Sequence, residues 1–301
     1  MNIKIPESFS RGVEGTFGKR GEVFLHALPT LIDEAAARWQ LKSLRPAEHF
    51  SYHFIVYARR EGSEVVLKLG VPDRELTSEI HALRQFAGRG AVRLIDGDSG
   101  RGMFLLERLK PGIALATVTD DAEATQIAAY VMLALLRPAP VDTGLLRLED
   151  WFEGFQRFRS QHGGSGPLDA GLFSQAENVA QEIMQEEHRP TLIHGDLHHF
   201  NILSSGSSWM AIDPKGVIGP AAYEVGPFLL NPAGEINRRP DAARLMRNRI
   251  AILGEILGID AERIRRCGLT HAVLSAVWSV EEGGDWKPAM EVAGLLAGLS
   301  E

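Results

Sequence analysis

The sequence predicts an α+β protein with two lobes, a small antiparallel-sheet lobe at the N-terminal end and a larger helical lobe after it. Short apolar runs with strand-like composition gather before residue 110, and helical spacing of apolar residues dominates most of the chain beyond it. At 301 residues the chain is long enough for two lobes with a sizeable core. We expect residues 1–108 to form the first lobe and residues 109–301 the second.

The N-terminal lobe is expected to start with an arm and a helix. Glycines three residues apart among charged residues within 1–21 favour a mobile arm, and apolar residues between Glu22 and Gln40 share one helical face. Pro72 ends the third strand, and a helix is expected over 75–86. The expected strands occupy residues 41–44, 53–59, 65–69, 92–95 and 103–109.

The C-terminal lobe is expected to be almost wholly helical after Lys110-Pro111-Gly112 interrupts the strand pattern. The exception is the region around 191–218, where short β-rich runs surround polar residues. The expected helices occupy roughly residues 120–136, 148–160, 168–187, 239–257, 260–281 and 286–299.

Composition excludes some classes of protein. A net charge of -7 argues against nucleic acid as the main partner, because binding a phosphate backbone needs a basic face. The same charge balance would suit a cationic small molecule. Cys267 is the only cysteine, the first residues resemble no signal peptide, and no apolar run is long enough to span a membrane. We therefore expect a cytoplasmic protein; nothing in the sequence indicates its oligomeric state.

The segment from His194 to Asn201, followed by Asp213, carries the strongest functional signal. Asp196 lies five residues before Asn201, and Asp213 lies twelve residues beyond Asn201 after a hydrophobic run. Phosphoryl transfer from ATP needs one carboxylate facing the acceptor hydroxyl and oxygen ligands for the metal. We predict that Asp196 orients the hydroxyl or takes its proton, and that Asn201 and Asp213 bind Mg²⁺. Each residue alone would be a cap or a turn residue; the three together favour catalysis.

A lysine on a predicted strand completes the nucleotide site. Lys68 lies near the end of an apolar strand, with apolar neighbours on both sides, where its ammonium could reach the α- and β-phosphates of ATP. Glu79 on the following helix could pair with Lys68, and Glu75 is the alternative partner.

The remaining nucleotide contacts have weaker sequence signals. Glu107 to Leu109 would connect the lobes, and backbone groups there could bind the adenine edge. No glycine-rich loop lies between the first two strands, although backbone amides around Ser51 could still approach the phosphates. The run from Gly12 to Arg20 superficially suggests a P-loop, but a required glycine and the hydroxyl residue are absent.

Histidines in the same segment suggest a second kind of site. His194 and His198 are four residues apart, which on a helix would suit zinc. Gly195 and the β-rich flanks argue against a helix, so His194 is interpreted as a packed structural residue.

These motifs, with Asp213-Pro214-Lys215-Gly216 and Tyr223-Glu224-Val225, resemble the aminoglycoside phosphotransferase family over roughly residues 25–285. The similarity is greatest to the branch of streptomycin 6-phosphotransferases and hydroxyurea-resistance kinases. The resemblance implies a bilobal, protein-kinase-like fold and ATP-dependent phosphorylation of a hydroxyl, with Asp196 as base, Asn201 and Asp213 on magnesium, and Lys68 with Glu79 at the phosphates. Lys215 replaces the last glycine of the protein-kinase metal-binding tripeptide, which favours a small acceptor over a protein.

The acceptor is the least determined part of the prediction. A cationic aminoglycoside such as streptomycin would need carboxylates near the cleft; a metabolite alcohol, either an amino alcohol or a sugar, is the alternative. A non-catalytic nucleotide-binding regulator is disfavoured because Lys68, Asp196, Asn201 and Asp213 are all present. The candidate substrate residues are Glu224, Glu281, Glu282, Asp285 and Trp286.

Overall fold

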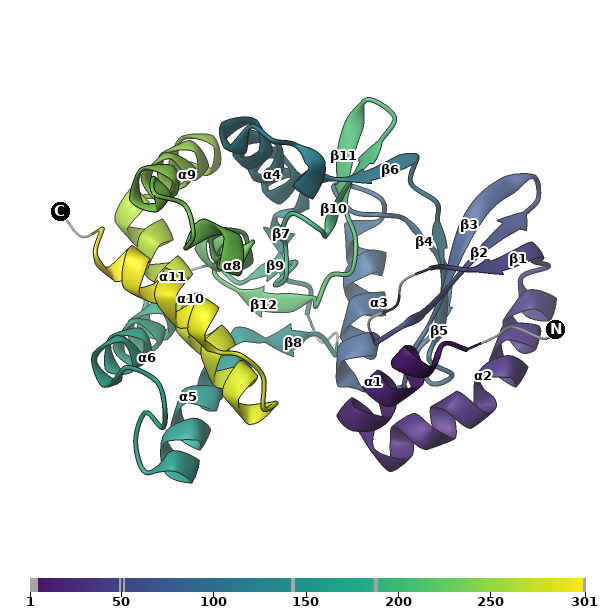
Figure 1. The fold of residues 1–301 in the computed structure, drawn as a ribbon. Coiled ribbons are helices and arrows are strands. Elements are labelled where there is room, and N and C mark those ends of the chain that lie inside the picture. The colour runs from purple at the N-terminus through teal and green to yellow at the C-terminus, as the bar shows by residue number, and fades with distance from the viewer. Residues whose placement is uncertain (1–4, 49, 51, 142–143, 187–188, 300–301) are drawn as a thin grey trace.

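The chain folds into two lobes joined side by side (Figure 1). A computed structural model describes residues 5–48, 50, 52–141, 144–186 and 189–299. The N-terminal elements form one lobe around a twisted sheet, and the green and yellow helices of the C-terminal part form the other. The predicted α+β architecture, with an antiparallel-sheet N-terminal part and a helical C-terminal part, is confirmed.

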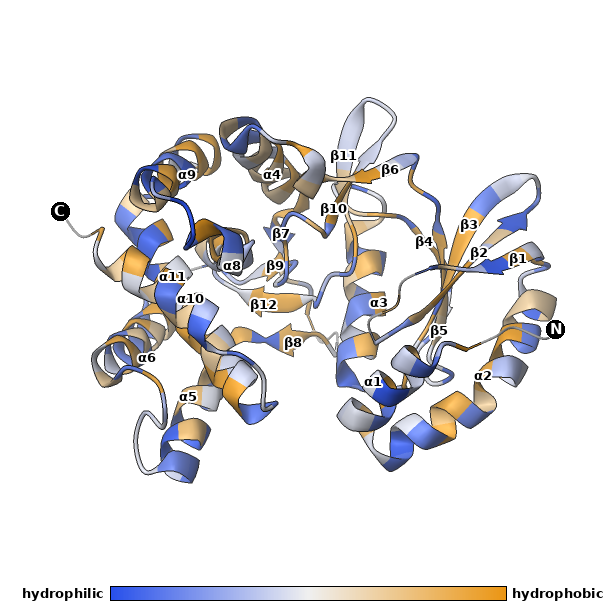
Figure 2. Ribbon diagram, in the orientation of Figure 1, coloured by the Kyte–Doolittle hydropathy of each residue, from blue (hydrophilic) through white to orange (hydrophobic). Residues whose placement is uncertain are grey.

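The N-terminal lobe is built on a five-stranded sheet in the order β1-β2-β3-β5-β4, in which all neighbours are antiparallel. Its strands are β1 (Lys42–Pro46), β2 (Phe54–Arg60), β3 (Ser63–Leu69), β4 (Leu94–Asp98) and β5 (Met103–Glu107). Apolar residues colour β2 and β3 along much of their length (Figure 2), as expected for central strands. The five predicted strands are therefore present, with ends that differ by a few residues.

The N-terminal arm is helical, so the prediction of a mobile arm is wrong. Helices α1 (Glu7–Phe17) and α2 (Lys19–Arg38) are separated by Gly18, whose φ is +53°. Phe9 and Val13, one helical turn apart, are buried against the N-terminal core. A Cβ on Gly21 would lie 2.5 Å from the Val13 carbonyl oxygen. The glycines thus allow two helices to cross closely, where their spacing had suggested flexibility.

Helix α3 (Arg74–Phe86) links the two lobes. Asp73 caps it by accepting a hydrogen bond from the Leu76 N–H at 2.8 Å. Its buried face, including Ile80, Leu83 and Phe86, belongs to the core cluster that continues through the helical lobe. The division of the chain near residue 108 therefore stays a prediction, because packing crosses it.

The C-terminal lobe surrounds one long central helix. α10 (Ala261–Glu281) is buried over much of its length and packs against α11, α7 and α6. The other helices are α4 (Asp121–Leu135), α5 (Leu148–His162), α6 (Ala170–Gln185), α7 (Gly226–Leu230), α8 (Ala233–Ile236), α9 (Ala242–Leu257) and α11 (Lys287–Ala297), with 3₁₀ turns η1 (Leu115–Thr117) and η2 (Ala221–Val225). The six long helices that were predicted are all present. Among the described helices, none is long and apolar enough to cross a membrane.

Two small sheets carry the polar segment of this lobe. One has the order β11-β10-β6, and the other has the order β7-β9-β12-β8. The strands are β6 (Pro111–Ala114), β7 (Arg137–Pro138), β8 (Leu146–Arg147), β9 (Thr191–Ile193), β10 (Ile202–Ser205), β11 (Ser208–Ala211) and β12 (Val217–Gly219). The loop between β9 and β10 and the turn after β11 are thereby brought together.

Candidate active site

The segment that carries Asp196 is a loop between two short strands. β9 ends at Ile193 and β10 begins at Ile202, so residues 194–201 connect the two small sheets. The Ile212 N–H donates to the Asn201 carbonyl at 2.9 Å, which holds the turn after β11 beside the end of this loop. The His194 imidazole lies within 2.8 Å of the Ile212 carbonyl and accepts from the Asp196 N–H at 3.2 Å. Both its ring nitrogens are occupied, so His194 has a structural role and is not placed to bind zinc.

Asp196 and Asn201 are in direct contact. The Asn201 Nδ2 donates to the Asp196 backbone carbonyl at 2.9 Å and lies 3.4 Å from its Oδ2. This bond uses the amide nitrogen, so Oδ1 is the atom of Asn201 that could bind a metal. Asp196, Asn201 and Asp213 all line one cavity of about 450 Å³. The structure therefore brings together the three residues whose spacing predicted phosphoryl transfer.

Asp213 has a left-handed backbone, with φ of +59°. A residue that precedes a proline is usually extended, and Asp213, which precedes Pro214, departs from that preference. Aspartate is one of the few residues that tolerates this conformation, and the strain it carries is typical of functional sites. Burial alone would raise the pKa of Asp213, but the Lys68 ammonium, 3.1 Å away, outweighs it and keeps the pKa low. Asp213 is therefore an ionised carboxylate facing the cavity.

Lys68 pairs with Glu79, which decides between the two predicted partners. The Lys68 Nζ donates to Glu79 Oε1 at 2.6 Å, and both side chains are buried. Burial lowers the pKa of Lys68, but Asp213 and Glu79 outweigh it, so the pKa is raised and the ammonium is charged. Glu75 instead accepts a hydrogen bond from Lys215 at 2.6 Å.

The donor set at this cavity fits magnesium. Asn201 and Asp213 offer oxygen atoms, which Mg²⁺ prefers, and this ion keeps several waters in protein sites. Among the described residues, no group of three or more His, Cys, Asp or Glu side chains is arranged to hold a metal. Two protein oxygens are enough where phosphate oxygens and water complete the coordination.

The predicted lobe connection borders a smaller, more apolar cavity of about 240 Å³. Glu107 and Leu109 line it from the connection, together with Val66 and Ile212. However, the Glu107 N–H donates to the Arg93 carbonyl at 3.1 Å, and its carboxylate accepts from the Arg93 N–H at 2.8 Å. Glu107 thus braces the connection, and its N–H is not available to a base. The predicted Ser51 contact lies outside the residues that the structure describes.

A third cavity, of about 550 Å³, lies on the other side of Asp196 against the helical lobe. Glu282 and Asp285 line it, as predicted for substrate residues. Two tryptophans that the sequence analysis did not single out, Trp151 and Trp278, line it as well and meet edge to face at 5.3 Å. They come from α5 and α10, so no sequence spacing joins them.

Three of the predicted substrate residues lie elsewhere. Glu224 is fully buried and accepts hydrogen bonds from the backbone N–H groups of His194 at 2.5 Å and Gly195 at 3.4 Å. Glu281 pairs with Arg157 at 3.1 Å, and Trp286 packs against the core of the helical lobe. Glu224 therefore holds the Asp196 loop from below, and cannot contact a substrate in this cavity.

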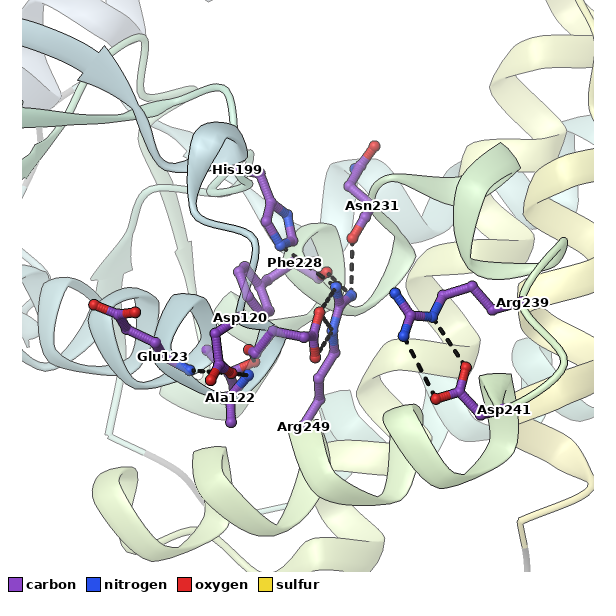
Figure 3. Close-up of polar contacts among 11 residues, drawn as sticks. Asp120, Ala122, Glu123, His199, Phe228, Asn231, Arg239, Asp241 and Arg249 are labelled. Carbon is purple, nitrogen blue, oxygen red and sulfur yellow. Dashed lines mark hydrogen bonds and ion pairs between the residues drawn. The ribbon is translucent and has the colours of Figure 1, made fainter.

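A buried arginine, Arg249, contacts the Asp196 loop at His199 (Figure 3). Arg249 of α9 is 2% exposed, and it pairs with Asp121 of α4 at 2.5 Å. Its Nη1 donates to the Asn231 carbonyl at 2.9 Å, and Nη2, the nitrogen that pairs with Asp121, also lies 3.4 Å from His199 Nε2. His199 also stacks on Phe228 with ring centroids 4.3 Å apart. This cluster joins two helices to the Asp196 loop, and sequence reasoning missed it because its members are far apart in the chain.

The three cavities adjoin. Lys68 and Asp213 line both the 240 Å³ and the 450 Å³ cavities. Asp196, His198 and Lys215 line both the 450 Å³ and the 550 Å³ cavities. An apolar pocket, the cavity lined by Asn201 and Asp213, and an acidic pocket thus adjoin in that order, and Asp196 lines the last two.

Comparisons with known proteins agree with this geometry. Residues 38–283 match the family model for aminoglycoside/hydroxyurea antibiotic resistance kinases. The chain is 32% identical to streptomycin 6-kinase of Streptomyces glaucescens over 93% of this chain and 92% of that protein. It is 34% identical to hydroxyurea phosphotransferase of Kitasatospora aureofaciens over 92% of this chain and 80% of that protein.

Solved structures share the fold at low sequence identity. Aminoglycoside phosphotransferase APH(4)-Ia in complex with ADP and hygromycin B superposes with a TM-score of 0.61 at 16% identity, covering 89% of this chain and 96% of that chain. Choline kinase LicA from Streptococcus pneumoniae gives 0.62 at 12% identity, covering 91% and 99%. The predicted kinase-like fold is confirmed. Because the family model matches residues 38–283, this protein belongs to the aminoglycoside/hydroxyurea antibiotic resistance kinase family.

Proposed function

We propose that this protein transfers the γ-phosphoryl group of ATP to a hydroxyl of an aminoglycoside such as streptomycin. The observation that carries the proposal is the shared cavity of Asp196, Asn201 and Asp213, which lies between an apolar pocket and an acidic one. In phosphoryl transfer the protein chiefly positions the reactants and stabilises charge, so such an arrangement suits the reaction.

Different residues of the cleft would bind the adenine, the phosphates and the metal. Leu109 and Val66 would contact the adenine, and Lys68, held by Glu79, would bind the α- and β-phosphates. Asn201 Oδ1 and the Asp213 carboxylate would hold Mg²⁺. When bound, that ion neutralises charge on the phosphate oxygens.

Asp196 would act on the acceptor. The acceptor oxygen forms a bond to the γ-phosphorus, the bond from that phosphorus to the bridging oxygen of ADP breaks, and Asp196 takes the hydroxyl proton. The products are ADP and a phosphate monoester. Burial raises the pKa of Asp196, which favours its acceptance of a proton.

The acceptor pocket suits a cation. Glu282 and Asp285 face it, while Arg157 is paired with Glu281 and Lys215 with Glu75. The Trp151 and Trp278 rings add surfaces that attract ammonium or guanidinium groups. ATP and a single buried cysteine, Cys267, suit the cytoplasm, where we place the reaction.

Hydroxyurea is a second candidate acceptor, which the 34% identity to a hydroxyurea phosphotransferase favours. An ADP-release assay with streptomycin, hydroxyurea, amino alcohols and sugars, with products identified by mass spectrometry, separates the acceptors. We expect phosphorylated streptomycin. Turnover of another acceptor with none of streptomycin would remove the aminoglycoside assignment.

A further inference from the structure

Lys215 lies where the phosphate cavity meets the acceptor cavity. It lines both spaces, together with Asp196, His198, Glu75 and Glu282. A phosphoryl group that leaves ATP near Asp213 and reaches an acceptor near Asp196 has to cross this junction. Lys215 is therefore adjacent to the path of the reacting group.

The backbone holds the stem of Lys215 against the Asp196 loop. The N–H of the next residue, Gly216, donates to the His194 carbonyl at 3.2 Å. A Cβ placed on Gly195 would lie 3.5 Å from the Lys215 Cβ. Because Gly195 directly precedes Asp196, the lysine stem and the predicted base start from neighbouring positions.

Separating the Lys215 ammonium from its partner Glu75 costs little free energy. Its ammonium pairs with Glu75 at 2.6 Å, but the two side chains are 39% and 61% exposed. Exposed ion pairs contribute about 0–1 kcal/mol, since water solvates both partners when they separate. An incoming phosphoryl group with several negative oxygens would compete effectively for this ammonium.

The cavity offers few basic side chains to the transferring group. Among the described residues that line it, Lys68 and Lys215 are the lysines, and no arginine is present. Lys68 already contacts Glu79 and Asp213. Charge in the transition state is spread over three equatorial phosphoryl oxygens at the junction, beyond the α- and β-phosphates that Lys68 is placed to bind.

We propose that Lys215 is a further catalytic residue, whose ammonium leaves Glu75 and donates hydrogen bonds to the equatorial oxygens of the transferring phosphoryl group. Lys215 keeps its protons and supplies charge, while Asp196 receives the proton of the acceptor. The inference rests on the proposed function only in that a phosphoryl group moves from ATP. It holds for any acceptor in the neighbouring cavity.

The test uses an analogue of the transferring group as well as turnover. Magnesium-ADP with aluminium fluoride mimics the phosphoryl group in transit, and magnesium-ADP alone does not. For Lys215→Met we expect kcat and the affinity for ADP-aluminium fluoride each to fall by about 10²–10³, the loss typical of a missing charge-stabilising donor. The affinity for ADP alone should change less than about threefold, because the proposed contact is to the transferring group and not to the diphosphate. Lys215→Arg should restore part of both losses, and Lys42→Met, an exposed lysine of β1, should have no effect.

Glu75→Gln separates catalysis from structure. If the Lys215–Glu75 pair merely held α3 in place, Glu75→Gln and Lys215→Met would lower kcat and analogue affinity equally. Equal losses, or a parallel loss of ADP and analogue affinity in Lys215→Met, would overturn the proposal. The analogue measurement needs no acceptor, so it decides the role of Lys215 even if streptomycin is not a substrate.

Discussion

The Glu224 carboxyl group accepts a hydrogen bond from the backbone N–H of His194 at 2.5 Å, from a position with no solvent exposure. A second bond from the Gly195 N–H, at 3.4 Å, ties the same carboxyl group to the residue before Asp196. The precision of the Asp196 loop thus depends on a buried acid that no substrate contacts. The first two predictions follow from this loop.

Glu224 should make stability depend on pH. Burial raises its pKa to about 8, against about 4.3 in an unfolded chain. Between these values the folded state binds more protons than the unfolded state, so the free energy of unfolding falls as the pH rises from about 4.3 to about 8. In Glu224→Gln we expect the free energy of unfolding to fall less over this pH range, by on the order of a few kcal/mol. Thermal unfolding at several pH values measures this difference, and Glu22→Gln, exposed on α2, is the control. Identical pH profiles for Glu224→Gln and the parent protein would refute the raised pKa of Glu224.

Gly195 should be required for activity because of the space around it. Its φ is +82°, and a Cβ there would lie 2.7 Å from Val217 Cγ2 and 3.1 Å from Trp151 Cη2. Gly163, at the end of α5, has a similar φ of +66° but nothing within 4 Å of its Cβ position. Alanine at either position costs about 1–2 kcal/mol of backbone strain. We expect kcat to fall at least about tenfold in Gly195→Ala and not in Gly163→Ala. The reason is that only the methyl group at position 195 would push the neighbouring Asp196 out of place. Similar kcat values for the two variants would contradict this.

The reaction centre could be predicted from the sequence because its key residues lie close together in the chain. Asp196, Asn201 and Asp213 fall within eighteen residues, counted inclusively from 196 to 213, and the turns between them follow from local polarity. The central strands β2, β3 and β5 were predictable for the same reason, since each contains a short apolar run that ends at a glycine or a charged residue.

The rest depends on contacts between distant segments. Arg249 meets Asp121 and His199, and Trp151 meets Trp278, through folding that no spacing reveals. Glu224 was expected beside the acceptor because it follows Asp213 closely, but η2 turns it under the loop instead. In α1, burial of Phe9 and Val13 outweighs the low helix propensity of glycine.

Asp196→Ala should abolish transfer and leave nucleotide binding intact. The change removes acceptor positioning, while Lys68, Asn201 and Asp213 remain to bind the nucleotide and metal. A missing general base typically lowers kcat by about 10²–10⁴. ADP release and calorimetric titration with ATP measure the two effects, and Asp196→Asn keeps the shape of the side chain as a matched control. Substantial residual transfer in both variants would count against a role for Asp196 in the chemistry.

Glu79 should set how tightly the site binds magnesium. Lys68 lies between Glu79 at 2.6 Å and Asp213 at 3.1 Å, so the two carboxylates share one ammonium. In Glu79→Ala the ammonium has only Asp213 of this pair, and it then competes with the metal for the same carboxylate oxygens. We expect the Mg²⁺ concentration for half-maximal activity to rise about tenfold, equivalent to about 1.4 kcal/mol. Titration of Mg²⁺ at saturating ATP measures it. Glu34→Ala is the control, because it breaks an ion pair with Arg101 away from the three cavities. An unchanged magnesium requirement in Glu79→Ala would show that Lys68 does not compete with the metal for Asp213.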